Sequence, residues 1–210
     1  MRRALAIWEK AYGPDHPQVA SGLNNLGGLL LATNRLDEAE PLYRRALEIS
    51  EKSLGRDHPT VAIRLNNLAQ LLQSTNRLDE AEPMMRRALA IDEKAYGPDH
   101  PDVAIDLNNL AGLLKTTNRQ AEAEPLMRRV VQIFEKAYGP DHPHVATSLN
   151  NLAQLLRVTN RLGEAEPLMR RALAINEKSL GRDHPSTVIS RKNLAALLRE
   201  LGRDQEADKL

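Results

Sequence analysis

Apolar residues recur along this chain with the spacing of amphipathic helices. Val19, Leu23, Leu26 and Leu30 are separated by steps of four, three and four residues, which places them on one stripe of a helix with about 3.6 residues per turn. A broader apolar face follows between positions 39 and 49. The pattern therefore predicts two successive amphipathic helices joined by a short turn.

Residues with strong local preferences mark the ends of the first helix. It is expected to begin after Asp15 and His16, because either side chain can cap the free amides of the first turn, and Pro17 is tolerated there. It is expected to end near Thr33 and Asn34, since Asn adopts the left-handed conformation that closes many helices.

The second helix is expected to begin near Leu36, where early acidic residues suit the positive end of the helix dipole. Pro41 is then expected within about the first turn, because deeper in the helix it would remove a backbone hydrogen bond. Gly55 is expected to end this helix.

The whole pattern repeats every 42 residues without an insertion, and the 210 residues make five such periods. Gly-Pro-Asp-His-Pro or Gly-Arg-Asp-His-Pro stands at 13–17, 55–59, 97–101, 139–143 and 181–185. One helical pair cannot bury its own apolar face, whereas stacked pairs form a continuous core. We therefore expect an all-α solenoid of about eleven helices, without strands, in a single array over 1–210. It would comprise a partial helix at 1–13, repeats at about 14–55, 56–97, 98–139 and 140–181, and a divergent C-terminal repeat at 182–210.

Composition narrows the classes of partner and chemistry. Lys and Arg number 29 against 28 Asp and Glu, which leaves no global field to attract nucleic acid or an acidic membrane. No stretch approaches the roughly 20 apolar residues of a membrane span. Cysteine is absent, which removes disulfides and thiol chemistry and suits a cytoplasmic protein.

Two repeated clusters are candidates for chemistry. The five Asp-His-Pro loops carry metal-ligating side chains, but equivalent atoms of successive repeats should lie about 10 Å or more apart, whereas zinc needs each ligand within about 2.3 Å. We therefore expect helix capping, and no metal or other cofactor. The Arg pairs at 44–45, 86–87, 128–129 and 170–171 could form a basic stripe, but Glu residues on the same helices make neutralising ion pairs the simpler interpretation.

The repeat resembles the tetratricopeptide repeat, in the 42-residue form found in kinesin light chains. Leu23, Leu26-Gly27, Leu30, Ala39, Tyr43 and Ala46 match signature positions of that family. The segments at 24–26, 36–42 and 55–59 are similar to the light-chain version. The resemblance covers the whole chain, and it implies a right-handed superhelix whose first helices line a concave groove that binds peptides.

Aligned on Leu26-Gly27, the family's groove positions include a ladder of Asn pairs that recurs on four successive first helices. Asn carries both a donor and an acceptor and could hold the backbone of an extended peptide whatever its side chains. Asn also has poor helix propensity, so eight of them inside helices require a reason. The alternative is that one Asn of each pair bonds the adjacent repeat. The candidate groove residues are Asn24, Asn25, Asn66, Asn67, Gln70, Gln73, Asn108, Asn109, Lys115, Asn150, Asn151, Gln154 and Arg157, with Asn25, Asn67, Asn109 and Asn151 favoured as ligand contacts.

The groove is expected to become more basic toward the C-terminus. The position of Leu31 becomes Gln73, Lys115, Arg157 and Arg199 in successive repeats. An acidic peptide would suit that end, and the resemblance implies the same preference, because cargo motifs of the light-chain family are acidic. The alternative is an ordinary solvated face.

Trp8 stands at a position that is otherwise chemically variable. Its equivalents at 42-residue steps are Ser50, Asp92, Phe134 and Asn176. Because a position that accepts Asp is expected to be exposed, Trp8 and Phe134 are predicted to lie at the surface. There they would contact a partner or, as we favour, fold back onto a neighbouring helix.

The leading functional hypothesis is a protein–protein interaction scaffold that binds a peptide segment. The alternative is a structural or sensory repeat array that positions other domains of a larger signalling protein. A one-base-per-repeat reader of RNA is disfavoured, because the groove residues are nearly identical and readers of sequence must vary. We expect no enzymatic activity, since no nucleophile–base pair or phosphate-binding loop can be constructed.

Residues 204–210 followed by residues 1–13 of a second molecule would spell one complete second helix. This continuity predicts head-to-tail stacking of chains, which is a heterologous contact that does not close.

Overall fold

The structure is a computed structural model that describes residues 2–210. Within that range the chain forms eleven α-helices, as the periodicity predicts, and no strand. The first helix of each repeat is 16 residues long, and these first helices are α2 (Pro17–Ala32), α4 (Pro59–Ser74), α6 (Pro101–Thr116), α8 (Pro143–Val158) and α10 (Pro185–Glu200). The second helices are α1 (Arg2–Tyr12), α3 (Leu36–Leu54), α5 (Leu78–Tyr96), α7 (Gln120–Tyr138), α9 (Leu162–Leu180) and the short α11 (Asp204–Ala207).

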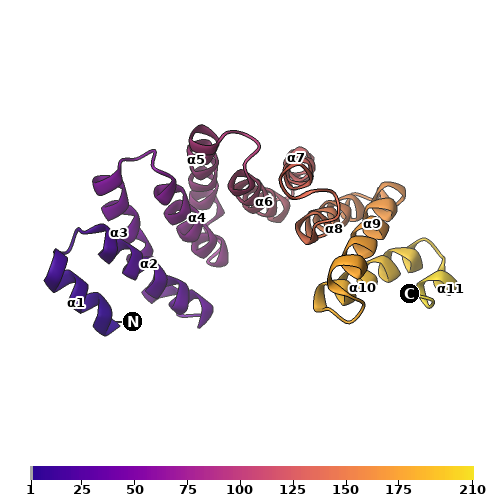
Figure 1. Cartoon of the computed structure of the whole chain (residues 1–210), viewed down its shortest axis with the longest axis horizontal. Coiled ribbons are helices and arrows are strands. Elements are labelled where there is room, and N and C mark those ends of the chain that lie inside the picture. The colour runs from indigo at the N-terminus through magenta and orange to yellow at the C-terminus, as the bar shows by residue number, and fades with distance from the viewer. Residues whose placement is uncertain (1) are drawn as a thin grey trace. The chain divides into compact units, whose positions relative to one another are not determined.

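The chain divides into two compact units, Met1–Pro98 and Asp99–Leu210. The boundary lies in the third of the repeated Gly-Pro-Asp-His-Pro loops, beside the repeat boundary expected from the sequence. In the first unit α2 packs on α3 and α4 packs on α5; in the second unit α6 pairs with α7 and α8 with α9 (Figure 1). Each unit is therefore built from helical hairpins.

Histidine caps every first helix. The Nδ1 atom of His58 accepts a hydrogen bond from the backbone N–H of Thr60 at 3.1 Å, and Pro59 follows it in the first turn. The same bond recurs at 3.2 Å from Gln18 N to His16 and in the three later repeats. Of the two capping residues that the sequence offered, His is the one that caps.

Asn closes each first helix in the left-handed conformation, as predicted. Asn34 has φ 56°, and its N–H donates to Leu31 O at 3.0 Å while that of Arg35 donates to Leu30 O at 2.8 Å. These two bonds satisfy carbonyls that a helix end otherwise leaves unpaired. Gly55 ends the second helix with φ 90°, a value that side-chain-bearing residues rarely adopt.

The prediction for Pro41 is wrong. Helix α3 begins at Leu36, so Pro41 is its sixth residue and lies past the first turn. The helix begins at Leu36, as expected, and the N–H of Ala39 already bonds to Arg35 O at 3.2 Å. Proline therefore removes one internal bond from a helix of 19 residues, and the following turns of α3 tolerate this loss.

In the first unit, the core lies between the two helices of each hairpin and between neighbouring hairpins. One cluster joins Val19, Ala20 and Leu23 of α2 to Ala46 and Ile49 of α3, all nearly fully buried. The cluster around Val61 and Leu65 repeats this arrangement in α4 and α5. The apolar stripe read from the sequence is thus the buried face.

Candidate functional site

Within each unit, asparagine side chains link the first helices of successive repeats. The second Asn of one pair bonds the first Asn of the preceding repeat: Asn67 Nδ2 donates to Asn24 Oδ1 at 2.8 Å. In the second unit, Asn151 Nδ2 donates to Asn108 Oδ1 at 3.3 Å. These bonds join successive repeats, so the structural role that we weighed against ligand binding is present in the geometry.

Each ladder amide keeps bonding capacity beyond that contact. A carboxamide offers two N–H donors and an oxygen with two lone pairs, whereas the bond to Asn24 uses one N–H of Asn67. Asn25 is exposed, and Asn67, Asn109 and Asn151 are half-buried. Asn24 and Asn66 are buried, and Asn108 and Asn150 are half-buried. The four second asparagines, which the sequence analysis favoured, are thus more accessible than Asn24 and Asn66.

The basic end of the ladder carries less free charge than the sequence predicted. Arg157 is half-buried and holds both carboxylate oxygens of Glu200 on the next first helix, with Nε 2.8 Å from Oε2. This hydrogen bond raises the pKa of Arg157 and lowers that of Glu200. Arg199 likewise pairs with Asp208 at 2.9 Å. The negative charges are supplied by Glu200 and Asp208, which do not stand at positions equivalent to Leu31. Comparison of that one position across the repeats therefore suggested a basic surface.

The remaining candidates lie on the same face of the first helices. Gln70 is exposed, and Gln73, Lys115 and Gln154 are half-buried. Gln154 Oε1 accepts from Arg157 at 3.4 Å.

Two neighbouring pockets lie along the ladder in the second unit. We call the first the aromatic-floored pocket; its volume is about 110 Å³, and it is lined by Ala104, Ile105, Asn108, Val130, Phe134, His144, Thr147, Ser148 and Asn151. We call the second the amide-floored pocket; its volume is about 210 Å³, and it is lined by Thr147, Asn150, Asn151, Gln154, Asn176, Ser186, Ile189 and Asn193. Thr147 and Asn151 form a shared wall, so four of the predicted site residues line a continuous pair of hollows.

The sequence analysis missed the residues at the bottom of these pockets. Phe134 and Asn176 are the fourth and fifth occupants of the position of Trp8, and that position was predicted to be exposed. The prediction is wrong, because Ser50, Asp92 and Asn176 are each 5% exposed or less. Trp8 itself is half-buried and packs on the core cluster of α2 and α3, so the favoured alternative, packing on a neighbouring helix, is confirmed for Trp8.

The residue opposite on the next first helix explains how one buried position accepts both Trp and Asn. Opposite Trp8 stands Gly22, and a Cβ added there would lie 2.7 Å from the indole ring. Opposite Asn176 stands Ser190, which accepts from Asn176 Nδ2 at 3.0 Å. The large indole of Trp8 thus packs against a glycine, which has no side chain, and the polar Asn176 packs against a polar serine. The signal that could have revealed this was the joint variation of positions 14 residues apart.

The floor of the amide-floored pocket is a small hydrogen-bond network. Asn176 Nδ2 donates to Ser190 Oγ and, at 3.4 Å, to Ser186 O. Asn150 Nδ2 donates to the same Ser190 oxygen at 2.6 Å. The Oδ1 atoms of Asn150 and Asn176 are buried without a protein donor. Such an acceptor costs about 1–3 kcal/mol, and a donor that reaches it gains that amount back.

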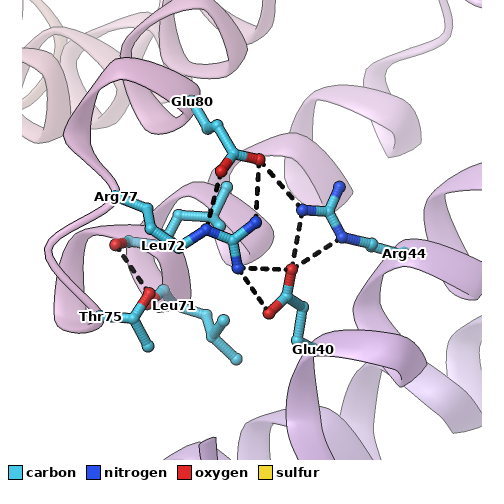
Figure 2. A network of polar contacts seen from close by, with 7 residues as sticks. All are labelled: Glu40, Arg44, Leu71, Leu72, Thr75, Arg77 and Glu80. Carbon is cyan, nitrogen blue, oxygen red and sulfur yellow. Dashed lines mark hydrogen bonds and ion pairs between the residues drawn. The ribbon is translucent and has the colours of Figure 1, made fainter. Parts of the chain in front are cut away.

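The repeated Arg pairs of the second helices are neutralised by ion pairs, as expected. Arg44 bonds Glu40 at 2.7 Å and Glu80 of the next second helix at 3.2 Å. Arg77 closes the ring, with 2.7 Å contacts to both carboxylates (Figure 2). The same four-membered network recurs in the second unit around Arg161 and Arg203. These arginines join repeats and do not form a basic stripe.

The histidine loops do not converge. Across residues 2–210, no three His, Asp or Glu side chains come together as a metal ion would require. No described helix has both the length and the apolar character needed to cross a membrane.

The fold and the ladder define the class as a helical repeat protein whose stacked first helices present a polar, pocketed face. The sequence matches the tetratricopeptide repeat family over residues 1–52, 18–94, 65–136, 121–178 and 149–210. The chain therefore belongs to the tetratricopeptide repeat family. Repeats of this class generally serve as non-enzymatic scaffolds for protein interactions.

Solved structures give the same fold. Nearly identical TPR-like repeats of kinesin light chain type from Podosopora anserina are 27% identical, with a TM-score of 0.80 and 92% of each chain covered. BtubC (BKLC) from P. vanneervenii is 24% identical with a TM-score of 0.84, over 99% of this chain and 82% of that one; at this identity the likeness shows the fold alone. No match was found among curated proteins.

Proposed function

We propose that this chain is a protein–protein interaction scaffold that binds a peptide segment along the asparagine ladder of its first helices. The observation that carries the proposal is the ladder itself: eight Asn side chains, two on each of four successive first helices, beside two pockets in the second unit. Amide side chains at one-repeat spacing match the donors and acceptors of a peptide backbone. The second Asn of each pair is the principal contact.

Exposed isoleucines run beside the ladder and support a peptide ligand. Ile63, Ile105 and Ile189 occupy equivalent positions on α4, α6 and α10 and are each more than half exposed. Apolar side chains next to amide groups with remaining hydrogen-bonding capacity are typical of sites that bind both the backbone and the side chains of a ligand. Lys115 remains a basic contact for an acidic residue of the peptide. Arg157 supports that preference less, because Glu200 neutralises it.

Peptide binding can be tested with a peptide array and with three ladder variants. We expect saturable binding of some peptides to the wild-type chain, and a loss of about tenfold or more in Asn25→Ala, Asn67→Ala and Asn109→Ala, since each removes hydrogen bonds to the backbone. Gln132→Ala is the matched control, because Gln132 is an exposed amide on the second helix α7. Thermal unfolding of each variant shows whether the loss of the bond between Asn67 and Asn24 alters the fold.

The same experiment addresses the alternative function, a structural or sensory array without a peptide ligand of its own. Binding to no peptide at all would favour the array. Binding that survives in all three ladder variants would place the peptide elsewhere on the surface.

Head-to-tail association belongs to the same proposal. Ile7 and Tyr12 on α1 are each more than half exposed, and a shallow hollow at α10 and α11 is lined in part by Ala195, Ala207 and Leu210. We expect Ile7 and Tyr12 of one copy to meet Ala195, Ala207 and Leu210 of another at high concentration, beside the basic residues of the hollow, which are Arg191, Lys192 and Arg199. Sedimentation velocity over a concentration series tests this, with Ile7→Glu expected to reduce association; a chain that stays monomeric throughout contradicts it.

A further inference from the structure

The ladder is too uniform to distinguish one peptide sequence from another. Its Asn pairs are identical in the first four first helices, and hydrogen bonds to a backbone carry no information about side chains. A discriminating contact must come from a position that varies between repeats. The occupants of the Trp8 position do vary, and in the second unit Phe134 and Asn176 lie at the pockets beside the ladder.

The two pockets are the same structural site one repeat apart. Ile105, Asn108 and Thr147 of the aromatic-floored pocket correspond, at a step of 42 residues, to Thr147, Asn150 and Ile189 of the amide-floored pocket. The residue opposite the floor is a serine in both, Ser148 and Ser190. The floor differs between the pockets, Phe134 in one and Asn176 in the other, and at the wall His144 of the first pocket is replaced by Ser186 in the second.

The aromatic-floored pocket suits an apolar side chain. Its floor and one wall are formed by Phe134, Val130, Ala104 and Ile105, and no carboxylate, Lys or Arg lines it. The rest of the lining is polar: Asn108, His144, Thr147, Ser148 and Asn151. Ile105 is 52% exposed, so an apolar ligand group on this wall would remove its surface from water, which favours binding. A carboxylate or an ammonium group would be desolvated there without a Lys, Arg or carboxylate partner.

The amide-floored pocket suits a neutral group that both donates and accepts. Asn176 is 2% exposed, and its Oδ1 atom, like that of Asn150, has no protein donor. Asn193 and Gln154 supply amide groups at the wall. A carboxylate would meet no Lys or Arg among the lining residues and a cation would meet no carboxylate, so either charge would be desolvated without compensation. A carboxamide carries a donor and an acceptor together.

We propose that the floor residues Phe134 and Asn176 determine sequence specificity, and that the ligand is a peptide with an apolar side chain followed or preceded by a Gln or Asn side chain. First helices of adjacent repeats lie about 10 Å apart, and an extended chain advances about 3.3 Å per residue. The two side chains are therefore about three residues apart. This inference rests on the proposed peptide-binding function and names the chemistry of its ligand.

A peptide library tests the inference directly. It consists of otherwise Gly/Ser peptides that carry Leu and Gln at separations around three residues, in both orders, with binding followed by fluorescence anisotropy. We expect Gln→Glu, which is nearly isosteric, and Gln→Leu each to weaken binding to the wild-type chain about tenfold, which is the loss of one well-placed hydrogen bond. Leu→Gln at the other site is expected to weaken binding by a similar factor.

Exchange of the floors supplies the matched variants. Asn176→Phe gives the second pocket the floor of the first, and it is expected to reverse the preference there from Gln to Leu. Phe134→Asn is expected to reverse the preference of the first pocket. Phe134→Leu is the conservative control, which keeps an apolar floor and the preference for an apolar side chain, and far-ultraviolet circular dichroism confirms that each variant remains helical.

The outcomes separate this inference from the proposed function. Peptides that bind in a ladder-dependent manner, with a ranking that does not change when the floors are exchanged, overturn the specificity inference and leave the scaffold function standing. Equal binding of the Gln and Glu peptides overturns the carboxamide assignment. Failure of every library peptide and every array peptide to bind the wild-type chain overturns both.

Discussion

At the scale of single residues, local preferences explain the ends of the helices and pairwise fit explains the core. Asn34 and His58 act through bonds to residues within four positions of themselves, so their roles follow from the sequence. The environment of Trp8 depends instead on Gly22, which lies 14 residues further along on another helix. For this reason the burial of Trp8 could not be predicted from the residues that occupy the same position in the other repeats.

Gly22 is expected to be the residue that makes room for Trp8. A Cβ at position 22 would approach the indole ring to 2.7 Å and Leu5 to 3.3 Å. Overpacking of this kind costs about 1–3 kcal/mol, whereas replacing Gly by Ala inside a helix gains about 1 kcal/mol. The cost of the clash should exceed the gain in helix propensity, so we expect Gly22→Ala to destabilise the chain by about 1 kcal/mol.

The control is the same Gly22→Ala substitution made in a chain that already carries Trp8→Ala. Without the indole there is no clash, so Gly22→Ala should then stabilise the helix by about 1 kcal/mol. The reversal of sign can be measured as the coupling energy in a double-mutant cycle of urea unfolding midpoints. A destabilisation of equal size in both backgrounds would show that Trp8 does not set the requirement for glycine.

At the scale of helices, successive repeats are joined by both apolar packing and a regular set of polar contacts. The sequence predicted the number, order and approximate bounds of the helices, because each depends on a period of 3.6 residues and on local end signals. It also located the ladder and the Arg pairs. It could not identify which atoms meet between repeats: Asn67 with Asn24 and Arg157 with Glu200 are each 43 residues apart. Those contacts depend on the stacking geometry.

The ring of Glu40, Arg44, Arg77 and Glu80 should link α3 to α5 more strongly than a single ion pair does. Exposed pairs contribute about 0.2–1 kcal/mol each, and Arg77 contacts two carboxylates. We expect Arg77→Ala to lower the urea concentration at the midpoint of unfolding. Arg35 occupies the equivalent position and pairs with Glu38 of its own repeat, so Arg35→Ala is the control and should cost less. Equal unfolding midpoints for the two variants would contradict this role of the ring.

Acid should weaken the same ring. Burial works to raise the pKa of Glu40, but hydrogen bonds and charges from Arg77 and Arg44 outweigh it and hold that pKa below its ordinary value. The hydrogen bond from Arg77 lowers the pKa of Glu80. A pKa lowered by folding stabilises the native state above the unfolded pKa of about 4.3, and that contribution is lost as the pH falls through the folded pKa.

We therefore expect the free energy of unfolding to fall as the pH decreases from about 5 to about 3. The decrease should be less steep in Glu40→Gln, because the amide cannot titrate. Urea unfolding at a series of pH values measures both slopes. Parallel slopes for the variant and the wild-type chain would show that Glu40 contributes no pH-dependent stability.

At the scale of the whole molecule, the division into Met1–Pro98 and Asp99–Leu210 gives a prediction about independent folding. Repeat proteins are stabilised by contacts within a repeat and with its nearest neighbours, and the second unit contains the complete pairs α6 with α7 and α8 with α9. It also retains His100, which caps α6 through a 3.2 Å bond from Asp102 N. The fragment 99–210 thus keeps whole hairpins together with the cap of its first helix. We expect it to be helical and to unfold cooperatively in urea.

A fragment of residues 120–210 is the control for this expectation, since it begins at α7 and lacks the partner α6. The apolar face of α7 includes Val130, which is buried when α6 is present, and exposing such a face removes the packing that stabilises a helix in water. The shorter fragment should therefore lose more helical signal than the removal of residues 99–119, which contain α6 and its flanking loops, accounts for. The contrary result would be a fragment 120–210 that is as helical per residue as 99–210 and unfolds at the same urea concentration. In that case the cooperative element of this array is the single stacked helix and not the hairpin.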